Sequence, residues 1–488
     1  MLMLLSILFP ILAGFALLLS GVERRRAREI WVLSAAFITA ALGLAAIFVG
    51  TDDTFVAVRF TGTITLAFRA DGLASIFGAM VSILWVLASF YALEYMKHEG
   101  METRFFGFFL MSFGVTLGVA FAANLVTMYL FYELLTLATL PLVMHAMDAK
   151  ARFAGKEYIL YSMTGAALGF VSMIFVLYYS GGADFVLGGA LDLGRIGGST
   201  DIMLLVYVLG FFGFGVKAAV FPFHKWLLSA SVAPTPVTAL LHAVAVVKSG
   251  VFAVIRLTYY SFGADVLFGT WAQVVVVCAA AFTIVYGSAN GLRSPHLKRR
   301  LACSTISNLS YILLGAAMMT PAGLVAALAH MLFHAVNKIT LFFCAGAVYY
   351  RTHKEYVYEV EGYGKVMPIT MAAFTLTALG LMGVPPLTGF VSKWRLSTAA
   401  LAADISVSWL AAAALIISAL LTALYLMTVV FAAYFPRKDK EKPAGEKVEN
   451  KDPNVFMTGP LITLCGAAVV MSIWAAPLLE LVTRLVSG

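Results

Sequence analysis

Charged residues are scarce in this sequence. Asp, Glu, Lys and Arg make up 12% of its 488 residues, whereas hydrophobic residues make up 61%. Soluble domains carry about 25% charged residues, so the composition excludes an ordinary soluble protein and indicates a polytopic membrane protein. The net charge of +8 does not indicate nucleic-acid binding, because the basic residues gather in short loops between apolar runs.

Cysteine is also scarce, and cofactor motifs are missing. The four cysteines, Cys278, Cys303, Cys344 and Cys465, lie singly in or beside apolar runs without CxxC spacing. This pattern argues against disulfides, zinc and iron–sulfur clusters. The sequence has no GxGxxG after a predicted strand, no Walker loop and no CxxCH. We therefore expect no cofactor and no metal in this chain.

Long apolar runs, in contrast, are abundant. A membrane span needs about 20 apolar residues, which predicts an all-α polytopic membrane protein with about fourteen transmembrane helices. They cover residues 2–20, 29–50, 71–95, 104–123, 125–145, 157–180, 203–228, 235–260, 268–289, 301–318, 322–349, 368–394, 406–435 and 457–482. Residues 51–70 alternate in polarity and contain Gly62, which predicts a β-hairpin lying on the membrane surface.

Fourteen spans place alternate loops on opposite sides of the membrane. With the N-terminus outside, the cytoplasmic loops hold 22 lysines and arginines, and the outer loops hold only Arg59, Arg69 and Arg195. This asymmetry follows the positive-inside rule and predicts that both termini lie outside. The last cytoplasmic loop, at residues 437–452, carries many charges of both signs and is predicted to be a flexible, solvated linker.

Two predicted spans contain prolines that interrupt a helix. In the seventh span, Pro222 cannot donate a hydrogen bond to the carbonyl of Ala218. In the twelfth, prolines at 385 and 386 leave the carbonyls of Leu381 and Met382 without helical partners. Each break is either an ordinary kink or part of the lining of a hydrated cavity.

The two broken segments resemble each other. Lys225-Trp-Leu-Leu-Ser229 lies 168 residues before Lys393-Trp-Arg-Leu-Ser397. Paired broken helices in corresponding halves are typical of transporters built from inverted repeats. We predict two inverted five-helix repeats, at residues 104–260 and 261–435. Residues 1–103 would hold three helices and the surface hairpin, and residues 436–488 the charged cytoplasmic loop and the last helix.

A few ionisable residues lie inside the apolar runs. A charge at bilayer depth costs about 2.5–3.5 kcal/mol on insertion scales. Glu133, Lys217, Lys248, Lys338 and Lys393 occupy such positions, on five different predicted helices. One acid and four bases distributed in this way favour an ion pathway over ion pairs that only stabilise the fold.

The residue types suit proton transfer. A lysine can release its proton, whereas arginine stays charged in proteins, and a carboxylate near Lys217, such as Glu133, favours the charged lysine. His330, His334 and Lys338 share one face of the eleventh predicted helix. They are candidates for a relay, the alternative being histidines packed against polar neighbours. The predicted proton pathway comprises Glu133, Lys217, Lys248, His330, His334, Lys338 and Lys393.

Four segments resemble the antiporter-like subunits of respiratory complex I and their relatives. They are Lys217–His242, Leu297–Ser307, Phe333–Phe342 and Gly383–Lys393. The family includes proton-pumping subunits of NADH–quinone oxidoreductase, the large subunits of Mrp-type sodium/proton antiporters and the membrane arms of energy-converting hydrogenases. The resemblance implies fourteen helices in two inverted five-helix repeats. It also implies that the proton path of the family maps onto Glu133, Lys217, Lys248, His334, Lys338 and Lys393.

Lys393 in the twelfth helix, with no long lateral helix after the fourteenth, most resembles the D-type Mrp subunit or its hydrogenase counterpart. The resemblance implies the inner (plasma) membrane of a prokaryote. The implied partners are other membrane subunits of an Mrp or complex I-like assembly, including small hydrophobic subunits, together with the lipid bilayer, protons and, as a possible second ion, sodium. Flavin, iron–sulfur clusters and nickel–iron sites would belong to partner subunits.

The sequence is compatible with two functions. The resemblance implies a proton-translocating subunit of a multi-subunit complex, with or without coupling to sodium: an Mrp Na+/H+ antiporter, a complex I-like NADH–quinone oxidoreductase or an energy-converting hydrogenase. The alternative is a stand-alone secondary transporter of a small solute, which would need a pocket of substrate-sized polar groups at the membrane midplane. A structural scaffold does not explain the insertion cost of four lysines. No redox chemistry is expected in this chain itself.

The loop charges generate a topology prediction. In a chain whose four native cysteines are replaced, a cysteine placed within 437–452 should react with an impermeant thiol reagent only from the cytoplasmic side. A cysteine at Gly488 should react only from outside. The reverse labelling pattern would reject the predicted orientation.

Overall fold

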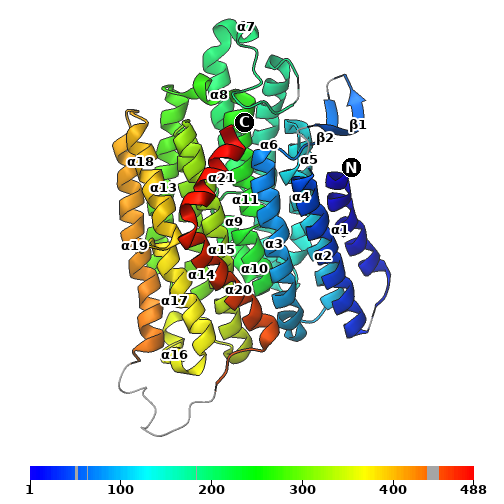
Figure 1. Cartoon of the computed structure of the whole chain (residues 1–488), viewed down its shortest axis with the longest axis vertical. Helices are drawn as coiled ribbons and strands as arrows, with labels where there is room; N and C mark the ends of the chain where they lie inside the picture. The colour runs from blue at the N-terminus through cyan, green and yellow to red at the C-terminus, as the bar shows by residue number, and fades with distance from the viewer. Residues whose placement is uncertain (23, 50–52, 63, 183, 437–449, 488) are drawn as a thin grey trace.

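The computed structural model of the chain describes residues 1–22, 24–49, 53–62, 64–182, 184–436 and 450–487. Over these ranges it is a bundle of helices with one two-stranded sheet, which confirms the predicted all-α polytopic fold. The long helices run along the vertical axis of Figure 1. Of the linker predicted at 437–452, residues 437–449 lie outside the described ranges.

The helices follow the apolar runs of the sequence. The α-helices are α1 (Leu2–Leu19), α2 (Arg25–Phe48), α3 (Gly72–Tyr95), α4 (Glu102–Ala120), α5 (Leu125–Val143), α6 (Ala149–Tyr179), α7 (Leu193–Ile196), α8 (Thr200–Gly215), α9 (Lys225–Ser229), α10 (Thr235–Ala243), α11 (Val246–Ile255), α12 (Ala264–Leu267), α13 (Trp271–Arg293), α14 (Leu297–Ala317), α15 (Pro321–Thr352), α16 (Tyr363–Val366), α17 (Pro368–Met382), α18 (Thr388–Ala402), α19 (Ser408–Tyr434), α20 (Val455–Ile473) and α21 (Ala475–Ser487). The single-turn 3-10 helices are η1 (Met96–His98), η2 (Gly197–Ser199), η3 (Ala230–Val232) and η5 (Val357–Glu359), and η4 (Arg256–Phe262) is a π-helix.

Twelve helical segments of the described chain are long and apolar enough to cross a membrane. They coincide with twelve of the fourteen predicted spans. The other two predicted spans lie on α14, which begins with three basic residues, and on α17 with α18, which a break divides. The chain is therefore a multi-pass membrane protein, and the count of fourteen stays a prediction. The four-part division of the chain and the inverted repeats also stay predictions.

The predicted interruptions of the helices are present. α8 ends at Gly215 and α9 begins at Lys225, on either side of Pro222. The prolines at 385 and 386 lie in the same way between α17 and α18. A third break separates α10 from α11 at residues 244–245, where the sequence has no proline. The predicted span at 235–260 is present, but the sequence did not predict this interruption within it.

The predicted hairpin is confirmed. β1 (Phe55–Thr61) pairs with β2 (Ile64–Phe68) in antiparallel register, and Phe55 lies opposite Phe68. Residues 51, 52 and 63 of the predicted stretch lie outside the described ranges. The hairpin stands at the upper right of Figure 1, at the end of the bundle, as expected for a surface element.

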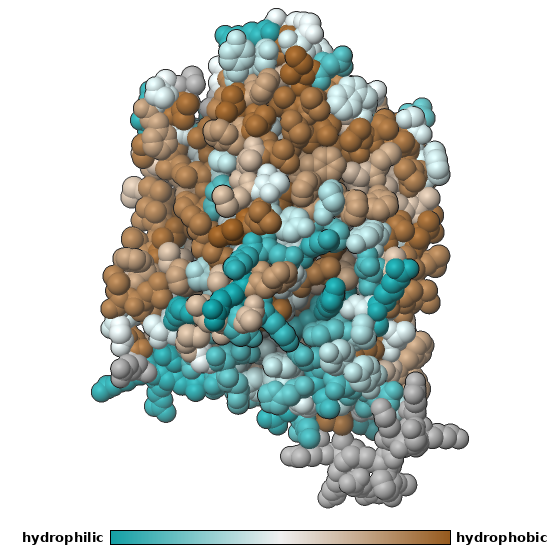
Figure 2. Space-filling view, turned by 180° about the vertical axis from the view of Figure 1, so that it is seen from behind, coloured by the Kyte–Doolittle hydropathy of each residue, from teal (hydrophilic) through white to brown (hydrophobic). Residues whose placement is uncertain are grey.

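The two ends of the bundle differ in polarity. Both termini lie in the upper part of Figure 1, whereas α19 ends and α20 begins at the lower end. Figure 2 shows hydrophilic residues gathered over this lower end, below a mostly hydrophobic belt. We call it the basic end, because it carries the Lys- and Arg-rich starts of α6 and α14. Which side of the membrane it faces stays a prediction.

The centre of the bundle consists of two segments. Within the span from Thr235 to Phe262, which contains α10 and α11, the most apolar stretch is entirely buried, and that of α15 is 94% buried. In α1, α6 and α20 the corresponding share is only 33%, so these helices form much of the outer surface. Residues on α11 and α15 are thus surrounded by protein, and their polar side chains must find partners within the chain.

Candidate proton pathway

Lys217 and Glu133 lie together at the first helix break. Lys217 follows the end of α8 and its side chain is 1% exposed. Its Nζ atom lies 3.6 Å from Oε1 of Glu133 on α5, and it also donates to the carbonyl oxygen of Tyr132. The predicted proximity of this acid and this lysine is confirmed. The Glu133 side chain is 28% exposed although its Oε1 atom is buried, so part of the side chain reaches the lateral surface beside the exposed Leu134 and Leu137 of α5.

Lys248 lies next to the third break, in the first turn of α11. Its Nζ lies 2.6 Å from Nδ1 of His334 on α15, and both side chains are buried. Gly250 lets α11 pack directly on the first break, because a Cβ there would lie 2.5 Å from the backbone nitrogen of Ala218 and 2.9 Å from Cβ of Lys217. The segments that carry Lys217 and Lys248 are therefore in contact.

The histidines of α15 continue the row of polar side chains. The rings of His334 and His330 have centroids 6.0 Å apart. Nδ1 of His330 lies 2.9 Å from the Ser392 hydroxyl and its Nε2 lies 3.2 Å from Oδ1 of Asn308. The one-face arrangement predicted for α15 is confirmed, and Ser392 directly precedes Lys393.

Lys393 forms hydrogen bonds at the second break, between α17 and α18. Its Nζ donates to the carbonyl oxygens of Leu381 at 2.8 Å and Met382 at 3.0 Å. These are the two carbonyls that the prolines at 385 and 386 deprive of helical partners. The ring of Tyr311 lies 5.4 Å below the ammonium group and stacks on His330 with centroids 5.2 Å apart, so it links Lys393 to the histidines.

Lys338 extends in another direction from α15. Its Nζ donates to the Leu301 carbonyl at 2.7 Å and to the Ser304 hydroxyl, both on α14. The structure therefore brings Lys248, His334, His330 and Lys393 into one row, with Lys217 and Glu133 at one end. Lys338 shares the helix face of the histidines but points toward α14 and the basic end.

A cavity of about 610 Å³ opens at the basic end near Lys338. Its lining includes Glu157, His224, Lys225 and Cys303, and Cys303 precedes the serine that Lys338 contacts. His224 is buried and lies edge-on to the Tyr286 ring. Glu157 accepts a hydrogen bond from Ser229. The cavity thus brings solvent to within a few residues of Lys338.

Some polar residues of the buried centre are not among the predicted set. Arg256 at the start of η4 is fully buried and forms a bidentate pair with Asp71, with both N–O distances 2.7 Å. Its signal in the sequence is an arginine within the apolar run 235–260. His242 is also buried, its ring 4.8 Å from that of Phe342. The sequence does not identify Asn308 and Ser392 as partners of His330, because uncharged polar residues are common in membrane helices.

Among the described residues, no group of three or more His, Cys, Asp and Glu side chains is placed to hold a metal ion. The side chains of the buried row are proton donors and acceptors joined by hydrogen bonds and short gaps. Lysine, histidine and glutamate each have a protonated and a deprotonated form that a protein interior can stabilise.

The sequence matches two family models that cover most of these residues. The model described as "NADH:quinone oxidoreductase/Mrp antiporter, TM" matches residues 122–422. The chain belongs to this family of antiporter-like membrane subunits. A second model, "NADH-Ubiquinone oxidoreductase (complex I), chain 5 N-terminus", matches residues 60–106. The predicted family is confirmed, and all seven predicted pathway residues lie within the first match.

Relatives of this antiporter-like subunit come from different complexes. It is 31% identical over 422 residues to NADH-quinone oxidoreductase subunit N of Desulforudis audaxviator, covering 83% of this chain and 81% of that protein. It is 32% identical over 347 residues to Hydrogenase-4 component B of Escherichia coli, covering 67% of this chain but only 50% of that longer protein. A chain in the structure of the Mrp complex from Dietzia sp. has the same fold, with a TM-score of 0.84 and 20% identity, covering 100% of this chain and 97% of that one. At this level of identity, the likeness establishes the shared fold.

The surroundings of Lys338 lead to a prediction that separates charge from packing. Lys338→Met should leave the free energy of unfolding within about 1 kcal/mol of wild type, because replacing a buried charge with an apolar chain of similar length is often neutral or stabilising. Ser304 still donates to the Leu301 carbonyl at 3.0 Å. Lys338→Ala should be less stable than Lys338→Met, since it leaves a cavity. Thermal unfolding in detergent compares the two, and a large loss of stability in the Met variant would show that the ammonium group holds α14 to α15.

Proposed function

We propose that this chain is a proton-translocating subunit of a multi-subunit membrane complex, with or without coupling to sodium. The observation that carries the proposal is the buried row of ionisable side chains from Glu133 and Lys217 through Lys248, His334 and His330 to Lys393. A stand-alone solute carrier would need central polar groups available to a substrate. Here the central groups are engaged with one another and with backbone carbonyls.

The residues would act by passing charge along the row. An ammonium group in an apolar interior is stabilised by a nearby anion or by hydrogen-bond acceptors. Glu133 supplies the anion for Lys217, and His334 supplies an acceptor for Lys248 at 2.6 Å. A change in the protonation of one group therefore alters the favoured state of the next. Protons would reach Lys338 from the cavity at the basic end and leave the row at Lys393.

The partners follow from the same geometry. Glu133 is partly exposed on the lateral surface, where a carboxylate facing lipid is unfavourable, so a neighbouring subunit would cover it. The complex would be an Mrp Na+/H+ antiporter or a complex I-like NADH–quinone oxidoreductase or hydrogenase in a prokaryotic plasma membrane, with small hydrophobic subunits among the partners. Both termini would lie outside. This chain would hold no cofactor, and any redox groups would belong to other subunits.

Removing charge from the row should stop translocation without unfolding the subunit. Glu133→Ala, Lys217→Ala and Lys393→Ala should each reduce proton pumping by the reconstituted complex to less than about a tenth of the wild-type rate, a barrier increase of about 1.4 kcal/mol or more. Lys365→Ala, which removes an exposed cation at the basic end, serves as the matched control and should pump normally. Near-normal pumping by all three pathway variants would reject the proposed row.

A second series tests the pairing of Glu133 with Lys217. Glu133→Asp keeps the charge one methylene further back, whereas Glu133→Gln removes the anion that stabilises the charged lysine. Pumping should therefore rank wild type above Glu133→Asp and Glu133→Asp above Glu133→Gln. Glu480→Gln, at an exposed acid of α21, controls for the loss of any carboxylate. Equal rates for Glu133→Gln and wild type would limit Glu133 to a structural role.

A further inference from the structure

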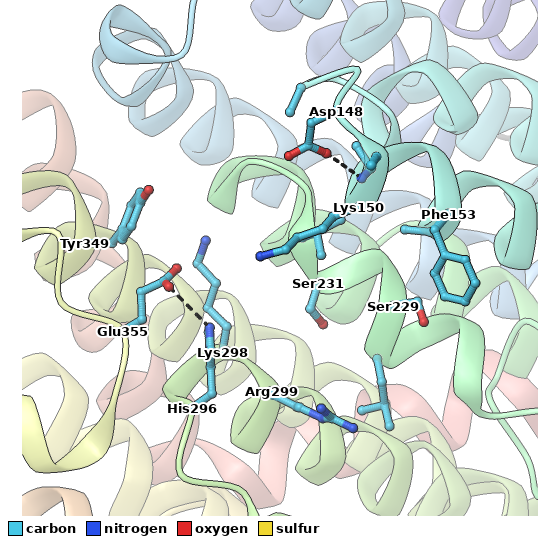
Figure 3. Close-up of a pocket in the computed structure, with 16 residues that line it drawn as sticks. Asp148, Lys150, Phe153, Ser229, Ser231, His296, Lys298, Arg299, Tyr349 and Glu355 are labelled. Carbon is cyan, nitrogen blue, oxygen red and sulfur yellow. Dashed lines mark hydrogen bonds and ion pairs between the residues drawn. The ribbon is translucent and has the colours of Figure 1, made fainter.

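A second cavity at the basic end gathers cationic side chains. It has a volume of about 740 Å³ and lies between the start of α6, the α9–η3 segment and the start of α14. Lys150, Lys298 and Arg299 line it. Figure 3 shows the Lys150 and Lys298 side chains extending toward one another from α6 and α14 across the space. None of these three residues belongs to the proposed proton row.

Lys298 is the unusual member of this group. It is only 8% exposed, yet among the described residues its ammonium group has no hydrogen bond or ion pair, and the Tyr349 ring lies 5.1 Å away. The two acids of the lining are engaged elsewhere. Glu355 faces His296 at 3.7 Å, and Asp148 accepts a hydrogen bond from the backbone of Ala151 at 2.7 Å. Glu355 and Glu99 act on the Lys298 ammonium from beyond ion-pair distance, so the cavity has room for an anion in direct contact with this largely buried cation.

The rim of the cavity is apolar on the side of α6. Phe153 of α6 lines the cavity and is 60% exposed. Val232 of η3 also lines it and is 46% exposed. Further along α6, Leu160 and Met163 are each 65% exposed. A cationic cavity therefore continues into an apolar strip on the outer surface of the bundle.

We propose that this cavity binds the phosphate of an anionic phospholipid from the leaflet at the basic end. The headgroup phosphate would lie between Lys150, Lys298 and Arg299, and the acyl chains would run along Phe153 and Leu160. Basic pockets between transmembrane helices bind such headgroups. Inorganic phosphate shares the headgroup chemistry, but it would make no use of the apolar strip.

The test measures lipid binding by the purified, delipidated complex that contains the full chain. Titration with phosphatidylglycerol, followed by native mass spectrometry, gives the affinity. Lys298→Gln and Lys150→Gln should each weaken binding about fivefold, which corresponds to about 1 kcal/mol per cation. Lys365→Gln removes a cation from the same end outside the cavity and should bind as wild type does. Phosphatidylcholine, which has no net charge, should bind weakly to every variant.

Competition with phosphate and the binding affinities of the variants decide the proposal. If millimolar inorganic phosphate fails to displace phosphatidylglycerol, the lipid is the ligand, and complete displacement would assign the site to free phosphate instead. Unchanged phosphatidylglycerol affinity in Lys298→Gln overturns the site, as does an acidic segment of a partner subunit found in the cavity of the intact complex. Should Lys298→Gln unfold in a thermal scan, Arg299→Gln at an exposed position gives the same test, with unchanged affinity again overturning the site.

Discussion

Hydrogen bonds from lysine ammonium groups to backbone carbonyls underlie the buried centre of this subunit. Lys393 donates to the carbonyls of Leu381 and Met382, Lys338 to that of Leu301, and Lys217 to that of Tyr132. A carbonyl freed by a helix break inside a membrane must find a donor within the protein, and a buried ammonium must find an acceptor. Lys393 and the two carbonyls freed by the break between α17 and α18 satisfy each other, whereas Lys217 and Lys338 find their acceptors within α5 and α14.

This mutual dependence positions the ionisable side chains. Because Lys393 is held by the end of α17, the preceding Ser392 lies within 2.9 Å of His330. The stacking of Tyr311 on His330 and beneath Lys393 fixes the same neighbourhood from α14. Lys248 differs, because its partner is the imidazole of His334 rather than a carbonyl. That contact joins two titratable groups directly and lies near the middle of the proposed proton row.

The two ends of the bundle have different physical roles. Away from the basic end, the Asp71–Arg256 pair ties the start of α3 to η4, with the Arg256 guanidinium enclosed by aromatic rings, among them that of Tyr260. An arginine that keeps its charge suits such a fixed contact. At the basic end, cavities reach inward between α6, α9 and α14. One approaches Lys338, and the other gathers the cations Lys150, Lys298 and Arg299. The Asp71–Arg256 pair therefore fixes one contact away from the basic end, and cavities open at the basic end.

The sequence by itself determined the membrane-spanning class, the hairpin, the proline breaks and the family. These depend on local properties: the length of an apolar run, the missing N–H of a proline, and residues adjacent in the chain. Only the tertiary structure decided which groups meet. Lys248 and His334 are 86 residues apart in the chain. The break between α10 and α11 contains no proline, so the sequence does not predict it. The partial exposure of Glu133 likewise depends on which helices pack around α5. Such contacts arise from the packing of distant helices, which no local pattern encodes.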